Sequence, residues 1–169
     1  MSQGQQPPRS QRSGGAGMQP TNPGTLLLAG VAAAAVAWLV IDNYYGSLPQ
    51  MPWLPPVSIF ALAVVEAVMA RTTKARIEHR PGAARVDPLS VARFVVLAKA
   101  SALAGALISG AYLSSVGWLV LRGRGLSSAA DDTPAAVAGL ISGLALVVAG
   151  LLLERACRVP PRPDDDEPA

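Results

Sequence analysis

The sequence predicts an all-α integral membrane protein with four transmembrane helices and disordered polar tails. Of the 169 residues, 51% are hydrophobic and only 15% are charged, whereas a soluble domain carries about 25% charged residues. The apolar residues fall into four blocks separated by Pro, Gly and charged residues, which is the pattern of a multi-pass membrane protein. We therefore divide the chain into an N-terminal tail (1–24), a four-helix membrane domain (25–157) and an acidic C-terminal tail (158–169).

The first span is expected at about residues 25–42. The tail before it is rich in Gln, Ser, Gly and Pro, so it cannot bury a core. A signal peptide is the alternative, because a basic leader precedes the apolar run. Bulky residues, "WLVIDNYYG", stand where a small-x-small cleavage site would follow. This favours an uncleaved span.

The second span is expected at about residues 54–70, and it contains Glu66. The preceding loop holds Tyr44, Tyr45 and Trp53, which suit the membrane–water interface. A basic segment, 71–87, follows the span and contains no apolar period.

The third helix has a clear start signal, because Asp87 is a good N-cap and Pro88 a good first helical residue. It can continue to Leu121, which gives a helix of about 51 Å at 1.5 Å per residue. That length exceeds the ~30 Å hydrocarbon layer. We therefore place its membrane span at about 94–121, with the first two turns at the interface or beyond.

The fourth span is expected at about 134–153, which contains no charged residue. Asp132 or Thr133 would cap this helix and Pro134 would open it. Three glycines of this span share one helical face, and the third span carries a matching stripe of small residues. Because small residues let membrane helices approach closely, we expect the two spans to pack tightly through Ala102, Ala106, Gly110, Gly139, Gly143 and Gly150.

The distribution of Lys and Arg predicts the orientation, since cytoplasmic loops are enriched in these residues. With the N-terminus inside, the cytoplasmic segments hold ten of them and the outer segments two. We therefore expect a multi-pass protein of the cell membrane with both termini in the cytoplasm. The ten are Arg9, Arg12, Arg71, Lys74, Arg76, Arg80, Arg85, Arg155, Arg158 and Arg162, and the two are Arg122 and Arg124.

Glu66 and Lys99 are charged residues within apolar spans. If Arg71 and Arg93 mark the interface, Glu66 lies ~7.5 Å deeper and Lys99 ~9 Å deeper. Because charges in a membrane usually face the bundle and pair, we predict a Glu66–Lys99 ion pair between neighbouring second and third helices. Two alternatives stay open. Lys99 can extend its ammonium to the interface alone, or one of the two groups belongs to a proton or solute pathway.

No catalytic residue, metal site or cofactor site is predicted. The single histidine, His79, lies in the basic segment, and the single cysteine, Cys157, follows the fourth span. The sequence has no Gly-rich phosphate loop, no HExxH motif and no GxSxG motif. We therefore expect no enzymatic activity and no nucleic-acid partner.

Two segments, "DPLSVARFVVLAKASALAGAL" (87–107) and "AADDTPAAVAGL" (129–140), resemble the actinobacterial family called domain of unknown function 3180. The resemblance covers roughly residues 24–158. It implies a small four-span membrane protein without an assigned activity. Asp87 stands where many relatives have histidine.

These observations predict a non-enzymatic accessory or scaffold component of the cytoplasmic membrane. Its partners would be the lipid bilayer and either further copies of itself or another membrane protein. The alternative is a small oligomeric transporter that uses Glu66 and Lys99 in a proton or solute pathway.

Overall fold

The structure is a computed structural model that describes residues 21–77 and 88–157. Its elements are α1 (Pro23–Tyr44), the short 3₁₀ helix η1 (Tyr45–Ser47), α2 (Leu54–Ile77), α3 (Pro88–Leu121) and α4 (Ser127–Ala156). Within these ranges, four helices are long and apolar enough to cross a membrane, and this confirms the all-α membrane fold. Asp87, His79, the C-terminal tail and all but the last residues of the N-terminal tail lie outside the described residues.

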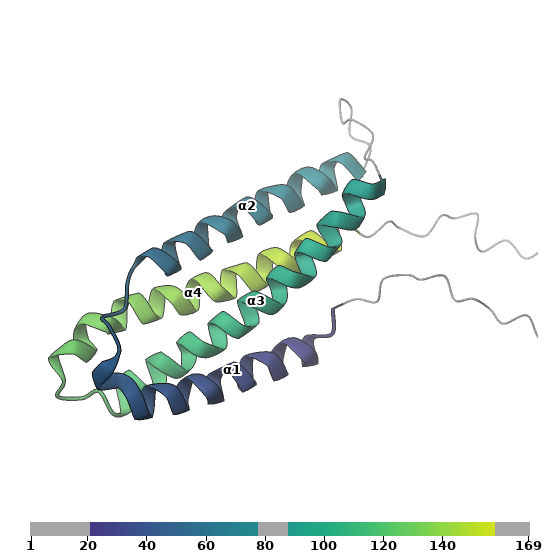
Figure 1. The fold of residues 1–169 in the computed structure, drawn as a ribbon. Coiled ribbons are helices and arrows are strands. Elements are labelled where there is room, and N and C mark those ends of the chain that lie inside the picture. Colours follow the sequence, from purple (N-terminus) through teal and green to yellow (C-terminus); the bar gives the residue numbers. More distant parts are fainter. Residues whose placement is uncertain (1–20, 78–87, 158–169) are drawn as a thin grey trace, which may run out of the picture.

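The helices pack in the order α1, α3, α4, α2 (Figure 1). The helix α1 packs along α3, α3 packs along α4, and α4 packs along α2. The sequence predicted that the second and third helices would be neighbours, but α2 packs mainly along α4. The central pair is therefore α3 and α4, and each outer helix is held chiefly by one central helix.

Glycines bring the backbones of α3 and α4 into contact. A Cβ atom added to Gly143 would lie 2.8 Å from the amide nitrogen of Ser109, and one added to Gly150 would lie 2.8 Å from the carbonyl oxygen of Ala98. From the other side, a Cβ atom on Gly105 would lie 2.8 Å from the amide nitrogen of Val147. Contacts this short require glycine, because the neighbouring atoms are backbone atoms. They explain how the two helices pack so closely.

The contact between α1 and α3 uses a second face of α3. A Cβ atom on Gly110 would overlap the Gly30 carbonyl group, and one on Gly30 would lie 3.2 Å from the carbonyl oxygen of Ala106. Further along, Gly117 faces the ring of Trp38 with ordinary spacing. Because residue numbers rise together along this contact, α1 and α3 run parallel.

The helix α2 buries one stripe of residues, at intervals of three and four. Its central part packs against Leu146 and Ala149 of α4. Its later part packs against Leu153 of α4 and Val95 and Ala98 of α3. The stripe consists of Ala63, Glu66, Ala70 and Thr73. Glu66 is therefore at the centre of the buried face of α2.

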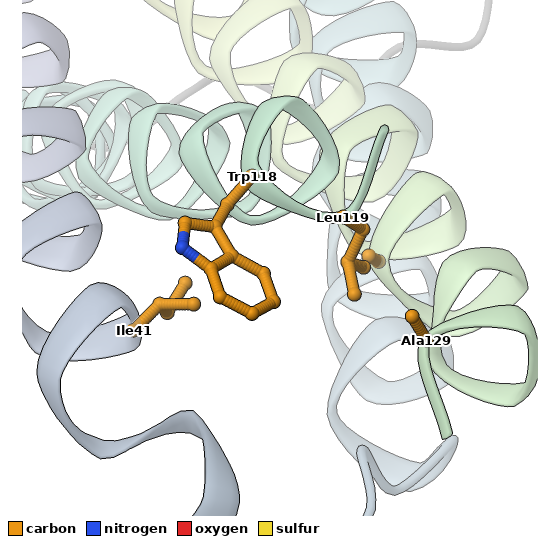
Figure 2. Packing of buried hydrophobic residues seen from close by; sticks show 5 residues of the cluster. Ile41, Trp118, Leu119 and Ala129 are labelled. Atoms are coloured by element: carbon orange, nitrogen blue, oxygen red, sulfur yellow. The ribbon is translucent and has the colours of Figure 1, made fainter. Parts of the chain in front are cut away.

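The end of the domain near η1 is closed by the connection between α1 and α2. Figure 2 shows the side chain of Trp118 beside Ile41, with Leu119 and Ala129 next to it where α3 meets α4. The ring of Tyr45 lies over Trp118, with a 4.4 Å separation between ring centroids. This cluster fixes the connection against the central pair.

The start of α4 differs from the prediction. The helix begins at Ser127, and Pro134 lies inside it. Asp132 does not cap the helix. Its buried side chain accepts hydrogen bonds from the Tyr45 hydroxyl (3.0 Å) and from the amide nitrogen of Met51 (2.9 Å). The sequence signal for a helix start was therefore misread, because Asp132 has a tertiary role that its position in the sequence does not show.

Candidate functional site

The candidate site is the carboxyl group of Glu66, which lies where α2, α3 and α4 meet. Only 1% of this residue is exposed. The hydroxyl of Ser101 on α3 donates a hydrogen bond to Glu66 Oε1. The second oxygen, Oε2, is buried and has no hydrogen-bond partner. A buried polar atom without a partner is unusual in a native structure, so this carboxyl group is the first place to look for function.

The partner of Glu66 is Ser101, whereas the sequence predicted Lys99. The half-buried Lys99 precedes Ser101 by two residues on α3. Residues two apart on a helix point about 200° apart and do not face the same neighbour. The depth of Glu66 and Lys99 in the membrane can be predicted from the sequence. The face of α3 that α2 approaches cannot, because depth says nothing about rotation around the helix axis. The structure therefore replaces the predicted ion pair with a hydroxyl–carboxyl hydrogen bond.

The other residues predicted for the site are at the helix contacts or at the end of a span. Arg93 is exposed, and the apolar stretch of α3 begins at this residue. Ala102 and Ala106 are buried. Gly139 lies under the ring of Tyr112, so a Cβ atom there would overlap the ring. Gly143, Gly150 and Gly110 form the backbone contacts described above.

A second buried carboxylate, Glu154, lies near the C-terminal end of α4. It accepts a hydrogen bond from the amide nitrogen of Thr21 (2.9 Å) and another from the Thr21 hydroxyl. Both oxygens of Glu154 are therefore engaged, in contrast to those of Glu66. This contact ties the segment before α1 to α4. This contact was not predicted, because Glu154 stands beside Arg155 at the end of a span, where charged residues are common.

A cavity of about 760 Å³ lies at the η1 end, between the α1–α2 connection and the central pair. Two of its acidic side chains are engaged in hydrogen bonds. Asp42 accepts hydrogen bonds from Trp118 Nε1 (3.0 Å) and from Arg122 (2.7 Å), and Asp132 bonds to the connection. The hydrogen bonds of Asp42 and Asp132 stabilise this end of the domain, so these two carboxylates have a structural role.

The chemistry available at Glu66 is limited by its neighbours. One carboxyl group and one hydroxyl offer too few oxygens to enclose a metal cation, which takes six or more ligands when it is Ca²⁺ or Mg²⁺. Within residues 21–77 and 88–157, no group of three His, Cys, Asp or Glu side chains comes together. No nucleophile–base pair adjoins the carboxyl group in the part of the chain described.

Comparison with known proteins gives one match. A family model described as "Protein of unknown function (DUF3180)" matches residues 26–161. Searches of curated proteins and of solved structures gave no match. The match covers most of the chain and all four helices, so the chain belongs to this family, as the two sequence segments indicated.

Proposed function

We propose that this protein is a non-enzymatic accessory or scaffold component of the cell membrane. The observation that supports this role is the unequal burial of the four helices. In their most apolar stretches, 39% of α3 and 44% of α4 are buried, compared with 11% of α1 and 22% of α2. The outer helices therefore keep most of their apolar surface available within the bilayer.

Such surfaces suit lateral packing against a helix of another membrane protein or of a second copy. On α1, Leu28, Val31, Val36 and Leu39 are all exposed large apolar residues. Helices associate in membranes through close van der Waals packing rather than through a hydrophobic driving force. A partner would therefore recognise the shape of α1, and a change in that shape would weaken its binding.

The orientation that goes with this role has both termini in the cytoplasm. It is supported by the excess of Lys and Arg in the segments assigned to the inside. The η1 end, with Arg122 and Arg124, would then face outward. A topology reporter fused after Leu48 tests the assignment, and a reporter that is active in the cytoplasm at this position would reverse it.

The accessory role is tested by extracting the full chain in native lipid particles and measuring which proteins the particles contain and in what ratio. We expect one protein partner, or a second copy, at a fixed stoichiometry. Val31→Trp on α1 should reduce that stoichiometry, whereas Leu121→Trp at the exposed end of α3 should not. Equal retention of the partner by wild type and Val31→Trp would argue against α1 as the contact.

The transporter alternative is favoured by one observation, the unpartnered oxygen of Glu66. The two apolar grooves that flank α4 do not favour it, because Ile141, Leu144 and Val147 lie along them. The purified chain in liposomes separates the two roles. If it dissipates a proton gradient by itself and Glu66→Gln does not, the accessory proposal fails and the transporter proposal replaces it.

A further inference from the structure

Glu66 differs from the other buried carboxyl groups of the described chain, Glu154 and Asp132, in how its two oxygens are used. Both oxygens of Glu154 accept hydrogen bonds from Thr21, and both oxygens of Asp132 accept bonds from the α1–α2 connection. At Glu66, Ser101 bonds to Oε1, while Oε2 is enclosed without a hydrogen-bond partner. The difference needs a physical explanation, because Glu66 is also among the most completely buried side chains.

The charged groups on the surrounding helices do not supply a partner for Oε2. On α3, Lys99 is half-buried and lies on another face than Ser101, and Arg93 is exposed. On α4, Glu154 is directed to Thr21. On α2 itself, Arg71 is exposed and follows Glu66 by five residues. Ala63, the residue of the stripe that precedes Glu66, packs in one apolar cluster with Leu146 and Ala149 of α4.

An ionised carboxylate in this position would be poorly stabilised, since it is removed from water and receives a single donated hydrogen bond. Buried groups of this kind become neutral instead. A metal cation cannot replace the missing partner with one carboxyl group and one hydroxyl as ligands. The ligand that fits the site is a proton.

We propose that Glu66 and Ser101 form a proton-binding site, in which the bound proton keeps α2 docked against α3 and α4. The docked state holds the carboxyl group in an apolar junction and therefore favours its protonated form. Release of the proton leaves a buried charge on the central residue of the α2 stripe, and undocking of α2 gives that charge access to water. Docking therefore weakens as the pH rises. This inference does not depend on the accessory role proposed above.

Proton occupancy is measured by infrared spectroscopy of the full chain in lipid, as the difference between wild type and Glu66→Gln. We expect the carbonyl stretching band of a protonated carboxyl group at neutral pH in wild type and its loss in Glu66→Gln. Glu154→Gln is the matched control, because Glu154 is also buried but has both oxygens bonded, and it should leave the band unchanged. Absence of the band in wild type would overturn the proposal.

The link to docking is measured at Cys157, which packs in the same cluster as Ala70 of α2. Undocking of α2 exposes this thiol, so its alkylation rate reports the position of the helix. The ratio of the rates for wild type and Glu66→Gln cancels the titration of the thiol itself. We expect this ratio to rise several-fold from acidic to alkaline pH. A ratio that stays constant, even where the infrared band is lost, would show that the proton does not control α2.

Discussion

Gly110→Ala should weaken the attachment of α1, and the structure permits an estimate of how much. A Cβ atom at this position would lie 2.8 Å from the carbonyl carbon of Gly30 and 2.9 Å from its Cα atom. Ordinary carbon contacts are about 3.5–4.0 Å, so the two carbon contacts alone would require the backbones to separate by about 0.6 Å or more. The Cβ atom would also overlap the carbonyl oxygen of Gly30, and this overlap requires a larger separation. Gly117→Ala is the matched control. It lies on the same helix and faces α1, but its Cβ atom would be 3.6 Å from Trp38.

Two terms determine the size of the effect. Replacing glycine by alanine within a helix contributes up to about 1 kcal/mol in favour of folding. Forcing an extra carbon into a packed contact costs about 1–3 kcal/mol. Subtracting the helix term leaves a loss of about 0–2 kcal/mol in the free energy of unfolding. Because the added Cβ atom would overlap the backbone carbonyl group of Gly30, we expect Gly110→Ala to lie at the upper end, near about 2 kcal/mol. Gly117→Ala adds only the helix term, so it should leave stability unchanged or raise it by up to about 1 kcal/mol.

The two variants are compared by titrating the purified protein in mild detergent with a denaturing detergent. Tryptophan fluorescence follows the loss of tertiary contacts, since Trp38 and Trp118 lie on the two helices concerned. We expect the midpoint for Gly110→Ala to fall below that of wild type and that for Gly117→Ala to equal or exceed it. Equal midpoints for the two variants would refute the close contact between α1 and α3.

Three further predictions concern the ends of the helices. Asp132→Ala should lower the free energy of unfolding by about 1–3 kcal/mol, because two donors lose their buried acceptor. The control Asp131→Ala, at an exposed position, should change it by no more than about 0.5 kcal/mol. The same denaturing-detergent titration measures both variants. Arg122→Ala should cost at most about 1 kcal/mol, since its ion pair with Asp42 is partly exposed, and a titration in high salt should show a smaller loss. Burial raises the pKa of the Cys157 thiol. At neutral pH this thiol should therefore react with iodoacetamide more slowly than a peptide thiol, and its reaction rate should increase as the pH rises. Equal rates for the two thiols at neutral pH would contradict this.

Much of the fold was predictable because helix spans depend on local composition. The third helix runs from Pro88 to Leu121, as the start signal and the apolar run predicted. The fourth helix starts earlier than expected, at Ser127. Proline is common in the first turn of a helix, but about two helical turns of α4 precede Pro134. Local signals identified the helix and misplaced its start.

The candidate site was only partly predictable, since the sequence gives the depth of a residue in a span more readily than its facing. Glu66 was identified correctly as a group that needs an explanation. Its neighbour was misidentified because the order of helices, α1–α3–α4–α2, cannot be obtained from the lengths of the spans. That order also decides which face of α3 meets α2, and it selects Ser101 over Lys99. A small hydroxyl residue among alanines carried no signal of its own.

The helix order also explains why carboxylates gather at the η1 end. The helices α1 and α2 form an outer hairpin whose arms lie on opposite sides of the α3–α4 hairpin. Their connection must therefore cross the ends of both central helices, and its backbone donors need acceptors where they leave water. Asp132 on α4 supplies one by accepting the amide hydrogen of Met51, and Asp42 joins the end of α1 to Trp118 on α3. These two acidic residues satisfy donors that the topology creates. Among the buried carboxyl groups of residues 21–77 and 88–157, this leaves Glu66 as the one that the architecture does not explain.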